Sequence, residues 1–184
     1  MLRKISLLAA LGLALPAAAH GDERQVMMED ALKAAPPGIA DKATVQDWRG
    51  NVLRQGTGEY TCMPTPPNMK GTAPMCFDRV WMAWADAWSK KAPFSTDKGG
   101  VAYMMAGDEG ASNFDPFAER GTAENQWVVE GPHLMLLMPT QAMDAFPVDP
   151  NNGGPYVMWK GTPYAHVMVP VGPRPAQPQV SEMK

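Results

Sequence analysis

Three histidines are the residues of this 184-residue chain best suited to bind a metal ion or to transfer a proton. An imidazole changes charge close to neutral pH and is also the commonest metal ligand in proteins. If the chain is cleaved after Ala19, His20 becomes the first residue, and its α-amino and ring nitrogens can together bind one copper ion. Either His133 or His166 would complete such a copper site.

The methionines give this copper hypothesis partial support. The chain contains 15 of them, and thioether sulfur is a ligand that suits Cu(I). Met135 and Met138 lie near a histidine, but on a strand this spacing points them to opposite faces. Methionine also fills irregular gaps in cores. We therefore favour core methionines and histidines that hydrogen-bond to backbone, with a copper-binding protein as the alternative.

A loop over residues 107–122 collects oxygen-bearing side chains that resemble the ligands of a hard cation such as calcium. These side chains are Asp108, Glu109, Ser112, Asn113 and Asp115. Their spacing does not match an EF-hand loop, and polar residues of this kind are also ordinary turn formers. Calcium is therefore a weaker expectation than copper.

Signals for catalysis are few. The chain has neither a GxSxG nucleophile elbow nor the SxxK, SDN and KTG set of penicillin-binding proteins. Ser112 with a histidine and an aspartate is an open alternative, because a catalytic triad is assembled in space rather than along the sequence. A small secreted hydrolase with His133 or His166 as general base is thus a second alternative, and a non-enzymatic protein is favoured.

A ligand-binding face is expected where polar residues border apolar strands near the end of the chain. Its expected members are Asn113, Asp115, His133, Tyr164 and His166, with Trp127 and Trp159 as the walls of a pocket. The expected ligand is a small molecule or a protein of the cell envelope.

Composition describes one loop-rich globular domain. Hydrophobic residues make up 45% of the chain, the formal net charge is −3, and there are 17 glycines and 19 prolines. This mild acidity argues against a nucleic-acid binder. Two cysteines are too few for a zinc-finger array or a cluster with four cysteine ligands.

The first 19 residues have the pattern of a secretory signal peptide. A basic start is followed by an apolar run from Ile5 to Leu15 and by three alanines that end at Ala19. The run is shorter than the roughly 20 residues that a membrane span needs. We expect a soluble mature chain without a membrane span, in the periplasm or outside the cell.

Export also predicts a disulfide between Cys62 and Cys76. Such a bond closes a proline-rich loop and contributes about 3 kcal/mol in the loop-entropy model. A redox-active pair is the alternative, but it usually has CxxC spacing.

The elements predict an α+β fold: a mostly antiparallel sheet of short strands with one tryptophan-striped helix packed on it. The helix is expected over residues 77–91, where three tryptophans recur at helical spacing. A hairpin is expected over 44–54. Further strands are expected at 59–63, 101–106, 126–130, 133–138, 156–160 and 164–171, and tight connections at 130–133 and 160–163 favour antiparallel pairing of their neighbours. The expected organisation is a signal peptide at 1–19, an arm or short helix at 20–40, one domain at 41–171 and a disordered proline-rich tail at 172–184.

Several segments together resemble an uncharacterised family of exported bacterial proteins that has no assigned function. The resemblance covers roughly residues 40–171 and is carried by the segments 75–78, 81–84, 107–113, 115–117, 131–135, 154–159 and 161–166. It implies an extracytoplasmic bacterial protein. It supplies neither catalytic residues nor a ligand.

Overall fold

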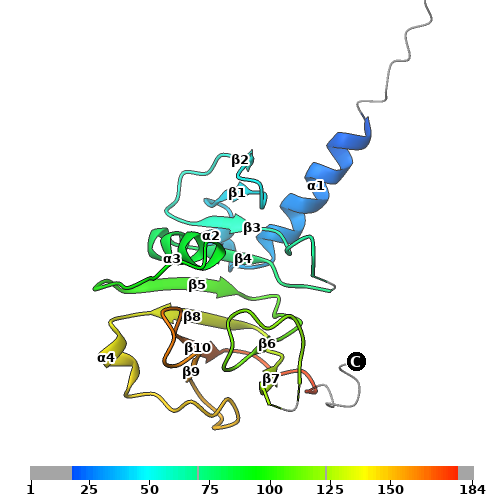
Figure 1. Ribbon diagram of the computed structural model, residues 1–184. Helices are drawn as coiled ribbons and strands as arrows, with labels where there is room; N and C mark the ends of the chain where they lie inside the picture. Colours follow the sequence, from blue (N-terminus) through cyan, green and yellow to red (C-terminus); the bar gives the residue numbers. More distant parts are fainter. Residues whose placement is uncertain (1–17, 70, 123, 178–184) are drawn as a thin grey trace, which may run out of the picture.

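The structure, a computed structural model, describes residues 18–69, 71–122 and 124–177. An eight-stranded, mostly antiparallel sheet forms its centre, with the strand order β2-β1-β3-β4-β5-β8-β10-β9 (Figure 1). The strands are β1 Thr44–Gln46, β2 Val52–Arg54, β3 Thr61–Met63, β4 Met75–Phe77, β5 Gly100–Met104, β8 His133–Leu137, β9 Tyr156–Met158 and β10 His166–Pro170. The predicted α+β fold is confirmed.

One end of the sheet contains the disulfide. Strands β1 and β2 form the predicted hairpin, and β1 also pairs in parallel with β3. Cys62 on β3 lies directly opposite Cys76 on β4, and the two are bonded as predicted. Strand β4 itself was not predicted, because the helical pattern was extended back to Phe77. The bond holds the short strand β4 in register between β3 and β5.

The tryptophan-striped helix is α3, Arg79–Ser89. Asp78 caps its first turn, where its carboxylate accepts a hydrogen bond from the backbone N–H of Trp81 at 2.9 Å. Trp81 and Trp84 are buried against the sheet, as the spacing predicts. The helix therefore covers the face on which Phe77 lies.

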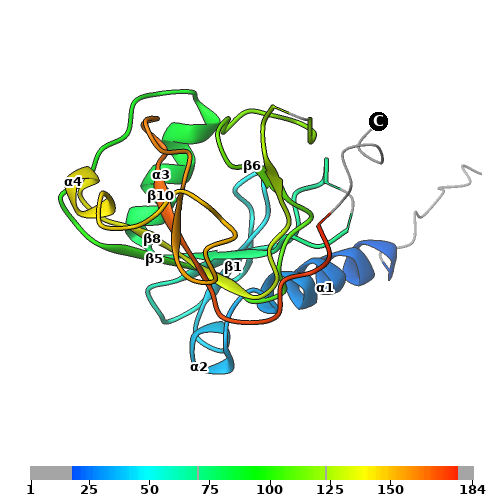
Figure 2. The ribbon, with the colours of Figure 1, turned by 90° about the horizontal axis from the view of Figure 1, so that it is seen from below.

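Different helices pack against the two faces of the sheet. The first core lies under α3 and includes Ala102, Met135 and Met168. On the opposite face, one core is covered by α1 (Ala18–Leu32) and α2 (Pro37–Ala40), and another by α4 (Thr140–Met143). Figure 2 shows α3 and α2 on opposite sides of the sheet. Among the described residues, no helix is long and apolar enough to cross a membrane.

The N-terminal helix α1 includes the predicted cleavage point, since it begins at Ala18. Cleavage after Ala19 would remove only its first two residues. Its last turn is buried at Ala31, and residues 21–26 are exposed. Figure 1 shows the start of this helix projecting away from the sheet. Residues 1–17 of the predicted signal peptide lie outside the described residues.

A second, two-stranded sheet differs from the prediction. Strand β7 (Trp127–Val128) pairs with β6 (Ala111–Ser112) rather than with β8, so the hairpin expected at 130–133 is absent. The prediction was wrong because Glu130 and Gly131 direct the chain inward before β8 begins, and both are buried. The connection at 160–163 does join an antiparallel pair, β9 and β10.

The proline-rich C-terminal segment follows β10. The sequence predicts disorder from Gly172, but as far as Gln177 the structure gives this segment defined contacts with Val129 and Glu130. The contacts are made by two side chains, Arg174 and Gln177, and the amino-acid composition of a segment does not reveal such individual interactions. The rest of the predicted tail, 178–184, lies outside the described residues.

Candidate functional site

Polar side chains gather where β5 ends and β8 begins. Met104, the last residue of β5, lies opposite His133, the first residue of β8. The chain then turns through Gly107 at a φ of 76°, and a Cβ atom there would lie 2.8 Å from the carbonyl oxygen of Glu130. Only glycine fits this close approach, which places Asp108 beside Glu130.

Asp108 is a largely buried carboxylate, and only one of its oxygens accepts a hydrogen bond from the described residues. Its Oδ1 accepts hydrogen bonds from the backbone N–H groups of Gly110 and Glu130, both at 2.9 Å. Its Oδ2 lies 3.9 Å from Nε2 of His133, and the side chain is 12% exposed. Burial raises the pKa of Asp108, and the Glu130 carboxylate adds to this rise while His133 opposes it.

His133 faces Asp108 with an unpartnered nitrogen. Its Nδ1 lies 2.8 Å from the carbonyl oxygen of Gly131, and because a carbonyl only accepts, Nδ1 carries the hydrogen. Nε2 is buried and has no hydrogen-bond partner among the described residues. Nε2 therefore lies beside a carboxylate oxygen, and a hydrogen on either atom, or a donor between them, would join the two.

Glu130, in contrast, is fully partnered. It is 1% exposed, and its Oε1 accepts a hydrogen bond from the hydroxyl of Tyr156 at 2.8 Å. Arg174 binds both oxygens: its Nε donates to Oε2 at 3.0 Å and its Nη2 donates to Oε1. Burial and the neighbouring Glu130 carboxylate raise the pKa of Tyr156. We call Asp108, Glu130, His133, Tyr156 and Arg174 the polar cluster.

A cavity of about 520 Å³ opens beside the polar cluster. Its acidic lining residues are Asp108, Glu109 and Glu130, and none of the lysines or arginines that the structure describes lines it. The apolar part of the wall comes from Val129 and from prolines of the C-terminal segment. The cavity therefore combines negative charge with apolar surface.

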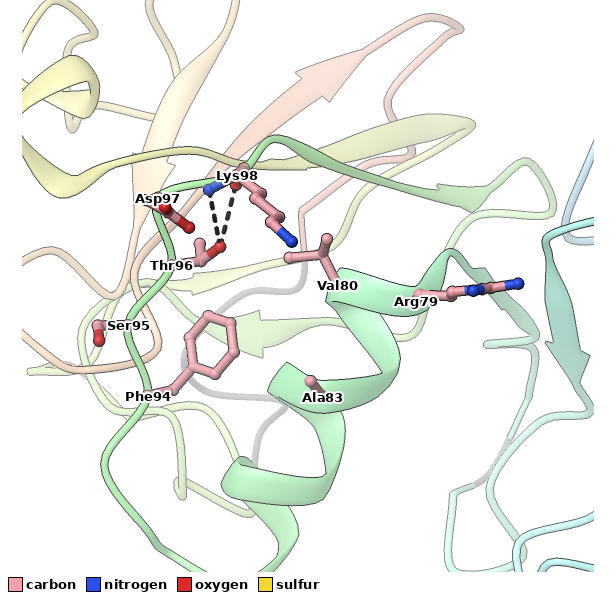
Figure 3. A pocket seen from close by; sticks show the side chains of 8 residues that line it. All are labelled: Arg79, Val80, Ala83, Phe94, Ser95, Thr96, Asp97 and Lys98. Atoms are coloured by element: carbon pink, nitrogen blue, oxygen red, sulfur yellow. Dashed lines mark hydrogen bonds between the residues drawn. The ribbon is translucent and has the colours of Figure 1, made fainter.

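A second hollow, of about 690 Å³, lies between the first turns of α3 and the loop 94–98. Figure 3 shows the Phe94 ring beside Ala83 and the Thr96 side chain bonded to the backbone of Lys98. Arg79 at its rim is exposed and pairs with Glu59 outside it. None of the residues that line this hollow carries a buried polar group with an unused donor or acceptor. The polar cluster is therefore the better candidate site.

His166 lies in a different environment from His133. Trp81, Trp84 and Trp159 approach it edge to face, with ring centroids at 5.4, 5.7 and 5.0 Å. Its Nδ1 lies 3.0 Å from the carbonyl oxygen of Tyr164. Burial lowers the pKa of His166 to about 4, so it is neutral at pH 7. We call His166, Tyr164 and these three tryptophans the aromatic cluster.

The structure does not bring His133 and His166 to one metal site. His133 lies opposite Pro170, four residues beyond His166 on β10, which is roughly 13 Å along a strand. The side chain of His20 is not among those that the structure describes. The described residues contain no group of three or more His, Cys, Asp or Glu side chains that could hold a metal ion.

The other predicted site residues have structural partners. The amide of Asn113 donates to Gln126 and to the carbonyl of Val148, and its backbone oxygen accepts from the N–H of Trp159. Asp115 accepts from the backbone N–H of Phe117, and the Trp127 indole donates to the carbonyl of Glu109. Neither cavity described above is lined by Trp127, Trp159, Tyr164 or His166.

The geometry does not suit a serine hydrolase. Ser112, the nucleophile considered from the sequence, is 1% exposed, and its hydroxyl donates to the carbonyl of Asn125. In a triad the carboxylate holds one ring nitrogen and the other faces the nucleophile. In His133 a carbonyl holds Nδ1 and Asp108 faces Nε2, which leaves no nitrogen to receive the proton of a nucleophile.

Sequence reasoning singled out Asp108 and His133, but for separate sites, and it missed Glu130, Tyr156 and Arg174. An available signal was an acidic residue, Glu130, directly before a Gly-Pro turn in an apolar region. A comparison of the chain with protein-family models, with curated proteins and with solved structures finds no match.

Proposed function

We propose that the protein is an exported, non-enzymatic binding domain that takes a small organic cation in the cavity beside Asp108. The observation that carries this proposal is the carboxylate of Asp108 in the lining of that cavity: its Oδ2 accepts no hydrogen bond from the described residues, and the buried Nε2 of His133, also without a partner there, lies 3.9 Å behind it. An ammonium group supplies several N–H donors and a positive charge. It therefore matches both the hydrogen-bonding deficit and the charge of the carboxylate.

The lining of the cavity supports the same class of ligand. Arg174 pairs with Glu130, and within the described part of the chain no basic residue lines the cavity beside the carboxylates of Asp108 and Glu109. Val129, Pro132 and Pro175 offer apolar surface to a short hydrocarbon chain. A primary alkylamine combines the two features, since its head is cationic and its tail is apolar.

Export is supported by the sequence and by the disulfide. The basic start, the apolar run and the alanines before His20 favour a signal peptide. The bonded pair Cys62–Cys76 suits an oxidising compartment such as the periplasm or the cell exterior. The resemblance to exported bacterial proteins favours the same location.

The experiment is calorimetric titration of the full chain with n-butylamine, and with n-butanol as the neutral probe. We expect the amine to bind and the alcohol to give no signal. Asp108→Asn retains the acceptor for the backbone of Gly110 and removes the charge, so we expect amine binding at least ~10-fold weaker, about 1.4 kcal/mol. Because burial raises the pKa of Asp108 and an ammonium group binds the charged form of the carboxyl, affinity for the amine should fall as the pH is lowered, which titrations at several pH values measure.

The matched control is Asp144→Asn, which removes an exposed carboxylate paired with Lys160. It should bind the amine like the unmodified chain. Equal affinities of the Asp108→Asn and Asp144→Asn proteins, or equal signals for amine and alcohol, would contradict the proposal.

A further inference from the structure

The C-terminal segment 172–177 is held against the domain as a peptide is held in a groove. It contains neither helix nor strand. The side-chain amide of Gln177 makes two hydrogen bonds to the main chain of Val129. Its Oε1 accepts from the N–H and its Nε2 donates to the carbonyl, each at 2.9 Å. Val129 directly follows the short strand β7, so the amide of Gln177 satisfies backbone groups at the end of a strand.

Arg174 is the anchor of this segment. Glu130 is almost fully buried, and its cationic partner is Arg174, a residue 44 positions later in the chain. The planar guanidinium matches both carboxylate oxygens, which a lysine ammonium does not do. The guanidinium carbon also lies 5.9 Å from the centre of the Tyr156 ring. The domain therefore presents a specific receptor for one arginine side chain.

The backbone around this receptor allows an extended chain to approach closely. A Cβ atom on Gly131 would collide with the carbonyl oxygen of Pro173. The next residue, Pro132, accepts a hydrogen bond from the N–H of Val171 at 2.9 Å, and a Cβ atom on Gly172 would lie 2.8 Å from its ring. The surface is therefore shaped to receive a polypeptide backbone as well as a side chain.

We propose that this surface, formed by Val129, Glu130, Gly131 and Tyr156, binds an extended, arginine-containing peptide of a partner protein. We call it the tail groove, because the segment 172–177 occupies it in the free chain. Charge complementarity between the buried Glu130 carboxylate and an arginine selects the partner. This inference goes beyond the binding of a small cation. The tail groove adjoins the cavity and shares Val129, Glu130 and Gly131 with its wall, but its anchoring carboxylate is Glu130 rather than Asp108 and its ligand is a peptide.

The test uses a fluorescent peptide with the sequence of residues 171–177, and the same peptide with alanine in place of its arginine. Anisotropy titration measures binding to the full chain, to Arg174→Lys and to Arg174→Ala. The tethered segment competes at an effective concentration in the millimolar range. We therefore expect the Arg174→Ala protein to bind the arginine peptide at least ~10-fold more tightly than the unmodified chain does. Arg174→Lys should be intermediate, and the alanine peptide should bind weakly to all three.

Arg174→Lys retains a positive charge beside the Glu130 carboxylate and should therefore fold. It keeps the test possible if the Arg174→Ala protein does not fold. The control is Arg79→Ala, which removes an exposed arginine paired with Glu59 and should behave like the unmodified chain. If the folded Arg174→Lys protein binds both peptides equally, the tail groove does not bind arginine peptides. A dimer that becomes monomeric in Arg174→Ala would assign the groove to a second copy of the chain, and would also overturn the proposal.

The result is separate from that for the small cation. Asp108→Asn should weaken binding of butylamine and leave the ratio of the two peptide affinities unchanged. The hydrogen bonds and the ion pair of Asp108 go to Gly110, Glu130 and His133 rather than to Arg174, and asparagine retains the acceptor for the Glu130 N–H. Failure of the amine titration thus leaves the peptide proposal standing, and the reverse also holds.

Discussion

The two buried histidines of this domain make the same local hydrogen bond in opposite surroundings. Nδ1 of each donates to the backbone carbonyl two residues earlier, Gly131 for His133 and Tyr164 for His166. His133 is 0% exposed and His166 is 2% exposed. However, Nε2 of His133 faces the Asp108 carboxylate, whereas the ring of His166 is surrounded by tryptophan edges and faces.

This difference shows that the neighbours decide what a buried histidine does. Aromatic rings offer His166 no proton acceptor, so burial keeps it neutral and it contributes packing. A carboxylate beside His133 creates a place for a proton or a cation. We therefore expect the packing of the aromatic cluster to make the largest contribution to the stability of the domain, and Asp108 of the polar cluster to determine binding of the small cation.

The largest expected effect comes from Trp84→Ala in the aromatic cluster. Trp84 is 6% exposed and stacks on Trp159 with ring centroids 5.8 Å apart. Truncation of a buried tryptophan leaves a cavity, which lowers the free energy of unfolding by about 3–5 kcal/mol. Chemical denaturation measures this loss. Under conditions where the variant is folded, its affinity for butylamine should be unchanged.

Trp127→Ala is the control for this substitution. Trp127 is half-buried on the small sheet, and its indole donates to the carbonyl of Glu109 at 3.3 Å. Its truncation should destabilise the domain by less than half as much. Equal losses at the two tryptophans would mean that the aromatic cluster does not hold a special share of the stability.

The next effect is a pH dependence that originates in His166. Its pKa is about 4 in the folded chain and near 6.5 in the unfolded chain, so between these values only the unfolded chain binds the proton. This stabilisation of the folded state is present above pH 6.5 and is lost as the pH falls toward 4. The loss corresponds to roughly 3 kcal/mol.

His166→Phe isolates this contribution. Phenylalanine retains an aromatic ring among Trp81, Trp84 and Trp159, and it cannot titrate. The lost hydrogen bond to Tyr164 is a constant offset at every pH. Unfolding free energies from pH 7 to pH 4 should therefore fall less in the variant than in the unmodified chain. Parallel curves for the two proteins would show that His166 titrates normally.

Much of the fold was predictable because its signals are local. The strand at 133–138 and the helix at 77–91 were predicted within two residues of β8 and α3, from apolar runs, periodic tryptophans and Gly-Pro boundaries. The parallel pairing of β1 with β3 and the pairing of β6 with β7 were missed. These depend on contacts between distant segments, for which a single sequence has no periodic signal.

The polar cluster was only partly predictable for the same reason. Asp108 and His133 carry recognisable chemistry, but their approach depends on the register of β5 with β8 and on the turn at Gly107. Arg174 lies in a segment whose prolines indicate disorder, and one ion pair with Glu130 holds it in place. Composition reports average behaviour, so it does not reveal a single buried partner.

The smallest expected effect compares one substitution in both clusters. The hydroxyl of Tyr156 donates to the Glu130 carboxylate, and that of Tyr164 donates to the carbonyl of Ala92, each at 2.8 Å. A hydrogen bond to a charged group contributes about 1.5–3 kcal/mol, and one between neutral groups about 0.5–1.5 kcal/mol. Tyr156→Phe should therefore destabilise the domain about twice as much as Tyr164→Phe in chemical denaturation.

The difference between these two variants depends on the charge of Glu130, which the pair with Arg174 maintains. In a Glu130→Gln background the acceptor for Tyr156 becomes neutral, so the loss caused by Tyr156→Phe should fall to that of Tyr164→Phe. A loss that is unchanged in this background would mean that the hydroxyl of Tyr156 contributes independently of the charge on residue 130. The difference between the two tyrosines would then reflect the burial of their hydroxyl groups rather than the charge of the acceptor.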